Sequence, residues 1–247
     1  MKSLRKTFDI LEYVMVQNGR AITPSEAAKA AELNLATCAR IMGKLAERGY
    51  LYKVSRKEGY IAGGVIYSLA NRKNVWHNLR AAAVEPVNRL AGELVRPVNL
   101  SILDGDKRIM LYYSGADERW QPWPQLFFDG YYDTATGRLL LATAEPEIVE
   151  KIWQRFGAPG TDVWPEVTSL ATLQQELTVI RRDKHVCFPS ADKQLWIAGH
   201  LLALNGFPAA AIGFGDWIDQ TPETVLDKSF RTIEKIRTLL SNNQPIF

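Results

Sequence analysis

The sequence predicts an α+β protein in which a small helical unit is followed by a larger domain built around an antiparallel sheet. Three observations predict it. Helical signals followed by a short aromatic hairpin fill residues 1–62, residues 98–113 alternate like two paired strands, and helical patterns flank that hairpin on both sides. With 247 residues, 47% of them hydrophobic, the chain can form two domains that each bury a core.

A run of capping and helical signals organises the first unit. Thr23 can accept a hydrogen bond at a helix N-terminus, Pro24 suits the first helical position, and Glu26 completes a capping box. A second helix can begin after Asn34 and end at Gly49. Its apolar face holds Cys38, Ile41, Met42 and Leu45, and its opposite face holds Thr37, Arg40 and Lys44. Two short helices joined by a tight turn predict a helix-turn-helix, with the second as recognition helix.

An aromatic hairpin follows the two helices. Residues 50–54 alternate, residues 55–59 have turn composition, and Tyr60 and Ile61 resume extended character, which predicts a two-stranded wing. Residues 1–62 hold eleven Lys and Arg against six Asp and Glu, whereas the rest of the chain holds nineteen against twenty-one. A generic helical pair with a solvated basic face is the alternative, but a basic excess confined to helices and wing favours DNA binding.

The recognition helix and the wing supply the candidate DNA contacts. Hydroxyl and cationic side chains on the helix can reach base edges, and its small apolar side chains can touch a thymine methyl group. The basic tip of the wing suits phosphates and carries little sequence information. The candidate DNA-binding residues are Leu35, Ala36, Thr37, Arg40, Lys44, Arg56 and Lys57.

The chain then passes into its second domain. Residues 62–64 break the pattern with two glycines, and a helix begins at Val65. We expect a DNA-binding domain over residues 1–62, a linker helix over residues 63–77 and a second domain over residues 78–247. Strands at 98–103 and 108–113 with a turn between them form the clearest hairpin, and an antiparallel hairpin argues against a doubly wound nucleotide fold.

Further elements follow in order along the second domain. The aromatic stretch 114–132, which includes Trp120 and Trp123, either lines a pocket or covers the sheet. Helices are expected near residues 146–156 and 169–180, strands near 185–188, 195–204 and 207–214 with a turn at Asn205 and Gly206, and a last helix over 222–240.

Composition argues against several classes of protein. No apolar run approaches the roughly 18 residues of a membrane-spanning helix, and the sequence enters an amphipathic helix directly, so we expect a cytoplasmic protein. Cys38 and Cys187 form no Cys-x-x-Cys pair, and a disulfide is not expected. His77, His185 and His200 are far apart, and no catalytic or metal-binding spacing includes them. We therefore predict neither an enzyme, nor a metal site, nor a cofactor.

The segment 33–50, with Thr37, residues 40–42 and residues 47–50, resembles the recognition helix of the IclR family of bacterial transcription regulators. Residues 134–142, 180–183, 196–198 and 210–213 resemble later segments of that family, so the likeness covers nearly the whole chain in order. The resemblance implies a GAF-like α/β effector domain. It also implies a ligand-responsive regulator that binds an inverted-repeat operator as a homodimer or homotetramer.

The resemblance also implies an effector pocket, and this chain departs from the family's pattern there. The matching positions are Ala135, Thr136, Trp196, Gly213 and Gly215. Because only Thr136 offers a side-chain hydroxyl and none of these residues offers a cation, we expect an effector that is not held like the small acids of some relatives. A flat or apolar group stacked on Trp196, or a closed pocket, fits these residues better.

Two rival interpretations stay open at this level. The second domain could be a small-molecule enzyme joined to a DNA-binding module, which turnover of a bound compound would reveal. It could also be an oligomerisation module only, which the absence of any ligand pocket would reveal.

Overall fold

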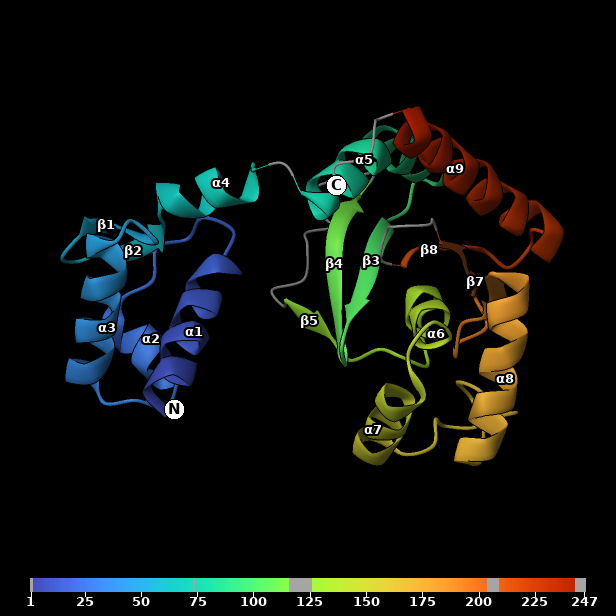
Figure 1. Cartoon of the computed structure of the whole chain (residues 1–247), viewed down its shortest axis with the longest axis horizontal. Helices are drawn as coiled ribbons and strands as arrows, with labels where there is room; N and C mark the ends of the chain where they lie inside the picture. The colour runs from blue at the N-terminus through green and yellow to red at the C-terminus, as the bar shows by residue number, and fades with distance from the viewer. Residues whose placement is uncertain (1, 73, 116–125, 204–208, 243–247) are drawn as a thin grey trace. The chain divides into compact units, whose positions relative to one another are not determined.

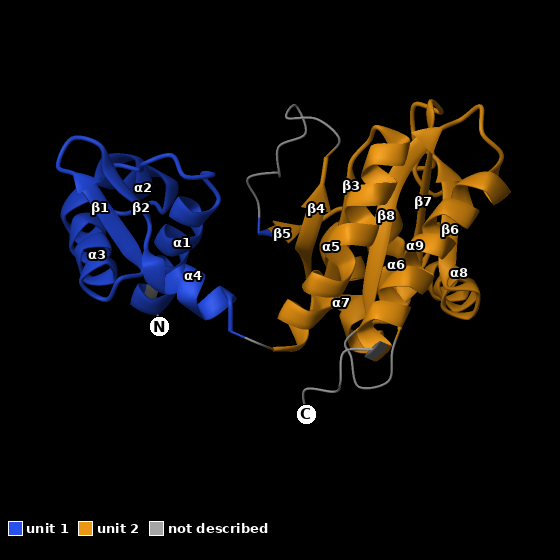
Figure 2. Ribbon diagram, turned by 90° about the horizontal axis from the view of Figure 1, so that it is seen from above, with its two compact units in different colours: residues 1–73, 123–126 blue, residues 74–122, 127–247 orange. Residues whose placement is uncertain are grey.

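The computed structural model describes residues 2–72, 74–115, 126–203 and 209–242, which form two compact units (Figures 1 and 2). The first contains residues 2–72 and Leu126, and the second contains the other described residues. Each unit has a hydrophobic core of its own. No helix formed by these residues combines the length and apolar character needed to cross a bilayer.

The first unit is a winged helix-turn-helix, as the sequence predicts. Three helices, α1 (Lys2–Met15), α2 (Pro24–Ala30) and α3 (Leu35–Glu47), precede an antiparallel hairpin of β1 (Leu51–Ser55) and β2 (Gly59–Ala62), and α4 (Gly64–Ala70) follows. Their shared core includes Ile10, Val14, Cys38, Met42 and Leu51.

The loop before α2 joins the wing to the helices. Ile22 and Tyr60 exchange two backbone hydrogen bonds of 2.8 and 2.9 Å. Gly59 allows this close approach, because a Cβ at its φ of +100° would lie 2.2 Å from the carbonyl oxygen of Ile22. The base of the wing is therefore held against the core of the helix-turn-helix.

The capping signals of the sequence are confirmed in detail. The Thr23 hydroxyl accepts from the Glu26 N–H at 3.3 Å, and the Glu26 carboxylate accepts from the Thr23 N–H at 2.9 Å. Asn34 accepts from the Thr37 N–H at 2.8 Å and starts α3. These short-range bonds fix where α2 and α3 begin.

The segment expected to form one linker helix, residues 63–77, is divided in the structure. Helix α4 ends at Ala70, and α5 (Val75–Leu94) begins five residues later. The break has a local cause: Asn74 is extended, and its side chain accepts from the His77 N–H at 2.9 Å, which caps α5 at this point. Residues from Asn74 onward belong to the second unit.

The second unit contains a six-stranded sheet in the order β5-β4-β3-β8-β7-β6, with every neighbouring pair antiparallel. The strands are β3 (Val98–Asp104), β4 (Lys107–Ser114), β5 (Phe127–Phe128), β6 (His185–Pro189), β7 (Leu195–Leu202) and β8 (Ala210–Trp217). Helices α5 and α9 (Pro222–Asn242) pack on one face. Helices α6 (Ala135–Leu141), α7 (Pro146–Phe156) and α8 (Leu170–Asp183) pack on the other. The predicted α/β domain with an antiparallel sheet is confirmed.

Strand alternation assigns each residue of β7 and β8 to one of these two faces. Ala198, Ile212 and Phe214 belong to the core under α5 and α9. Leu201 and Ala211 belong to the core under α6, α7 and α8. Even-numbered residues of both strands thus face α5 and α9, whereas odd-numbered ones face α6.

Two sequence predictions fall outside the described part of the chain. Residues 116–125, with Trp120 and Trp123 of the aromatic stretch, are one. The turn at Asn205 and Gly206 is the other.

Candidate DNA-binding face and ligand site

Helix α3 presents its polar face to solvent because its apolar face is used by the core. Cys38, Ile41, Met42 and Leu45 are buried. On the opposite side Leu35 is 53% exposed, Ala36, Arg40 and Lys44 are exposed, and Thr37 is half-buried. The five residues predicted to contact DNA from this helix therefore lie at or near its surface, and four are exposed.

The two cations on this face differ in their partners. Lys44 pairs with Glu47 at 2.7 Å, both side chains being well exposed. Arg40 forms no ion pair or hydrogen bond through its side chain with the described residues. Because an exposed ion pair contributes little, neither cation is held away from an approaching phosphate or base edge.

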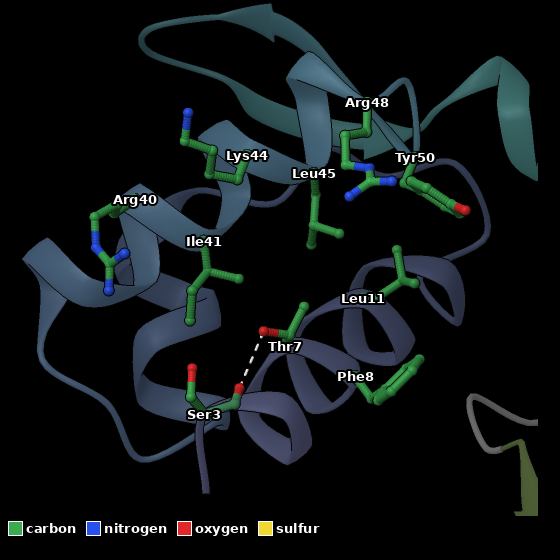
Figure 3. A pocket seen from close by; sticks show the side chains of 10 residues that line it. All are labelled: Ser3, Thr7, Phe8, Leu11, Arg40, Ile41, Lys44, Leu45, Arg48 and Tyr50. Carbon is green, nitrogen blue, oxygen red and sulfur yellow. Dashed lines mark hydrogen bonds between the residues drawn. The ribbon is translucent and has the colours of Figure 1, made fainter. Parts of the chain in front are cut away.

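A pocket of about 500 Å³ lies between α3 and α1. Figure 3 shows Ile41 and Leu45 of α3 across from Phe8 and Leu11 of α1. Arg40 and Lys44 of α3, and Arg48, which caps the C-terminus of this helix, follow one another at four-residue spacing; they also line the pocket and form a basic row beside this apolar floor. The pocket thus combines an apolar floor with a basic rim.

The wing tip is exposed and basic. Arg56 and Lys57 occupy the turn between β1 and β2, and the turn is closed by Ser55, whose hydroxyl accepts from the Glu58 N–H at 2.9 Å. The turn is therefore ordered by its own hydrogen bonds while both cations face water.

In the second unit, the first turn of α6 rests on β8. Ala135 and Thr136 are 2% and 1% exposed. A Cβ on Gly213 would lie 2.9 Å from the Thr136 Cγ2 and 3.5 Å from the Ala135 Cβ. Gly215 lies two residues further along β8 on the same face, beside Leu195 and Ile197. The structure thus places four of the five predicted effector residues on the α6 face of the sheet.

Trp196 lies on the opposite face. It is an even-numbered residue of β7, packs against the core under α5 and α9, and its indole N–H donates to the Gln220 carbonyl at 2.9 Å. A pocket that includes Ala135 and Thr136 therefore does not include the Trp196 side chain. The resemblance to the family matches residues to positions along a strand, but the alternation of side chains decides which face of the sheet each one meets. Here that alternation puts Trp196 on the opposite face from the other four residues.

Arg108 is a polar residue of this region that the sequence did not reveal. It lies on β4, is only 6% exposed, and donates through Nη1 to the hydroxyls of Thr136 at 2.6 Å and Thr134 at 3.1 Å. Burial lowers the pKa of the guanidinium, and the nearby Asp133 carboxylate opposes this. The site therefore contains a buried cation, contrary to the expectation from the matched positions. The one indication of this site in the sequence is that Arg108 occupies a position of an alternating strand whose side chain turns towards the core.

Polar groups continue from Gly213 onto β3. The Asn99 side chain donates to the Gly213 carbonyl at 3.1 Å and accepts from the Ser101 hydroxyl at 3.1 Å, and Ser101 is 1% exposed. Together with Arg108 and Thr136 they form a polar cluster on the α6 face of an otherwise apolar sheet. We refer to Asn99, Ser101, Arg108, Thr134 and Thr136 as the polar cluster.

The thiol and imidazole groups of this unit are arranged for packing. Burial, with lesser effects of Glu223 and Asp216, raises the pKa of Cys187 to about 11, so it is no thiolate nucleophile at neutral pH. His200 donates from Nδ1 to the Ser229 hydroxyl, whose own proton goes to the Leu226 carbonyl. Within the described residues no group of three or more His, Cys, Asp or Glu side chains could hold a metal ion.

Comparison with known proteins gives the same picture. Residues 3–55 match the IclR helix-turn-helix domain. No curated protein sequence matches the chain. The chain is similar to an IclR homologue from Microbacterium hydrocarbonoxydans complexed with 4-hydroxybenzoate, with a TM-score of 0.79, 20% identity, and 97% and 99% of the two chains covered.

Two further solved structures share the fold. For an IclR transcriptional regulator from Alicyclobacillus acidocaldarius the TM-score is 0.71 at 13% identity, with 98% of both chains covered. For IclR of Thermotoga maritima it is 0.63 at 18% identity, again with 98% of both chains covered. The resemblance to the IclR family is confirmed: the chain carries an IclR helix-turn-helix domain and has the fold of solved IclR regulators over nearly its whole length.

Proposed function

We propose that the protein is a ligand-responsive transcription regulator that binds an inverted-repeat DNA operator as a homodimer or homotetramer. Residues 1–62 bind DNA and residues 78–247 bind the effector and assemble the oligomer. Residues 63–77 link the two, and of these the part from Asn74 onward packs with the second unit. The single observation that carries the proposal is the exposed polar face of α3 in a domain that matches the IclR helix-turn-helix.

Recognition of DNA follows from the chemistry of that face. Thr37 and Arg40 can bond to base edges, Leu35 and Ala36 can touch thymine methyl groups, and Lys44 supplies positive charge beside them. Arg56 and Lys57 of the wing supply phosphate contacts that set the orientation of the domain. Helix α3 therefore reads the base sequence of the DNA, and the wing positions the domain on the phosphate backbone.

Assembly follows from the number of recognition helices. One chain has one such helix, and a single helix reads only a few base pairs, so two chains related by a two-fold axis suit an inverted repeat. Helix α1 supports self-association, because Leu4 is 60% and Phe8 51% exposed although both belong to its apolar stripe. A second copy of α1 would bury them.

The polar cluster under α6 supports an effector site in the second domain. An IclR homologue with the same fold has been solved in complex with 4-hydroxybenzoate, and this supports a small organic molecule as effector. The effector would act on DNA binding by changing the spacing of two recognition helices. Such a regulator binds its effector without a chemical step, so a bound compound should be recovered unchanged.

Selection of bound sequences from random DNA by the pure full-length protein tests this function. We expect enrichment of one inverted repeat whose half-sites are one or more helical turns apart. The double variant Thr37→Ala, Arg40→Ala should lose this enrichment. The control is Arg89→Ala, which removes an exposed arginine of α5 that pairs with Glu85 and should keep the enrichment. If no sequence is enriched, or if the double variant enriches the same sequence equally well, the proposal is wrong.

A further inference from the structure

The pocket between α1 and α3 has an apolar floor that is only partly covered. Ile41 and Leu45 of α3 are each 8% exposed, and Leu11 of α1 is half-buried across from them. Phe8 of α1 lines the same pocket and is 51% exposed (Figure 3). A volume of about 500 Å³ is that of a small-molecule site. An apolar occupant would remove part of the Phe8 ring from water.

The rim of this pocket is positively charged. Among the described residues that line the pocket, the charged ones are Arg40, Lys44 and Arg48, and none is acidic. A rise of about 1.5 Å per residue puts neighbouring members of this row roughly 6 Å apart along the helix axis. Within the described part of the chain, the carboxylate paired with the row is that of Glu47, on Lys44, and Glu47 does not line the pocket. The row therefore attracts an anion.

The α1 side of the pocket offers little to a polar group. Thr7 lines the pocket, but its hydroxyl donates to the Ser3 carbonyl at 3.0 Å within the same helix (Figure 3). Its proton is therefore already used. Charge lies on the α3 side of the pocket and apolar surface on its floor, so the two kinds of contact are separated in space.

Two kinds of occupant match only half of this arrangement. A DNA phosphate can pair with the cations but cannot cover the floor. A second copy of α1 can cover Phe8, but this helix has three basic and two acidic residues and does not neutralise the row. A molecule with an apolar body and one anionic head matches both halves.

We propose that this pocket binds an amphipathic organic anion, which excludes DNA directly. Its apolar body would lie on Phe8 and Leu11, and its anionic head on the row formed by Arg40, Lys44 and Arg48. Because Arg40 and Lys44 are also proposed DNA contacts, the head and the DNA compete for the same cations. This competition rests on the proposed DNA-binding role of α3. The site lies within the first unit, so release of DNA needs no signal from the second.

Calorimetry on the full-length protein measures the binding, with decanoate below its micelle concentration as the probe. Decanol has the same chain without the charge, and acetate has the charge without the chain. Decanol and acetate should each bind at least about tenfold more weakly than decanoate, because each loses one half of the contact. Decanoate should also displace the selected operator, and the operator should weaken decanoate by the same factor, since linkage is reciprocal.

A first pair of variants separates the pocket from self-association. Phe8→Ser removes the exposed part of the floor and should weaken decanoate about fivefold or more. Leu4→Ser removes a side chain of α1 that is 60% exposed but does not line the pocket, and decanoate binding should not change. Both variants remove apolar surface that a second copy of α1 would bury, so only the pocket distinguishes them.

A second pair of variants tests the anionic head. Arg48→Gln should weaken decanoate severalfold, because it removes a cation of the row. Arg5→Gln removes an exposed cation of α1 that does not line the pocket, and decanoate binding should not change. Arg48 is not among the proposed DNA-reading residues, so this variant reports on the ligand independently of base recognition.

Three results would overturn the site: decanoate that binds no tighter than decanol, binding that survives both Phe8→Ser and Arg48→Gln, or equal losses in Leu4→Ser and Phe8→Ser. Binding without displacement of the operator would overturn the direct exclusion of DNA. If the protein selects an operator that decanoate does not displace, the DNA-binding regulator stands and this inference is wrong. If no operator is selected, the proposed function fails, and calorimetry still tests the pocket.

Discussion

The Thr136 methyl group lies directly over Gly213, 2.9 Å from the point where a Cβ on that glycine would be. This contact joins the first turn of α6 to the centre of β8, and the glycine carbonyl accepts from Asn99 on the adjacent strand. The position of the polar cluster therefore depends on the absence of a side chain at residue 213.

Gly213→Ala should destabilise the second domain by about 1–3 kcal/mol, because the added methyl group overpacks a site that has no room to relax. The measurement is the free energy of unfolding in urea. Gly92→Ala is the control, since nothing lies within 4 Å of its Cβ position in α5 and alanine favours a helix. Equal stability of Gly213→Ala and wild type would mean that α6 can shift away from β8.

Arg40→Ala should weaken binding to the selected operator by about 1–3 kcal/mol if the guanidinium contacts a base edge. The loss should be larger for the operator than for unrelated DNA, and competition binding at fixed salt measures both. Arg231→Ala removes an exposed cation of α9 and should leave both affinities unchanged. If Arg40→Ala binds the operator with unchanged affinity, Arg40 does not contact a base edge.

Neutralising the wing tip with Arg56→Gln and Lys57→Gln should weaken binding to all sequences alike. Each phosphate contact contributes nearly one unit to the slope of log affinity against log salt, so the slope should fall by almost two units. Titrations at several salt concentrations give the slope. Lys151→Gln with Arg155→Gln, in the second unit, is the charge-matched control. A wing variant with the wild-type slope would place the wing away from DNA.

The pH dependence of stability should include a contribution from His200. Burial, with lesser effects of His185 and Arg237, lowers the pKa of His200 from 6.5 to about 4. Between these values the unfolded chain binds the proton more readily than the folded one, so stability is full above pH 6.5 and falls as the pH falls towards 4. Urea unfolding of wild type and His200→Gln across this range measures the effect.

In that series the free energy of unfolding of His200→Gln should fall less than that of wild type. Parallel curves for wild type and His200→Gln would show that His200 takes up its proton without cost in the folded protein.

Local structure was predictable because its causes lie within a few residues of one another. Thr23 and Glu26 close the capping box, Asn34 starts α3, and the alternation of residues 98–113 gives the hairpin of β3 and β4. A capping hydrogen bond joins residues three apart, and the side chains of a strand alternate with a period of two residues. Both can therefore be read directly from the order of residues in the chain. The exposed face of α3 follows from the same local reasoning, since its apolar stripe had to turn towards the core.

The ligand site was decided by contacts between residues far apart in the chain. Arg108 reaches Thr134 and Thr136 only because β4 and α6 meet in space, 26 and 28 residues apart in sequence. Trp196 is excluded because register and alternation turn it towards α9. By itself the sequence determined where α2 and α3 begin, the wing, the hairpin of β3 and β4, and the basic exposed face of α3, but not the break between α4 and α5. Only the tertiary structure decided which face each strand residue meets, because sheet pairing, and not proximity in sequence, brings a buried cation to a hydroxyl.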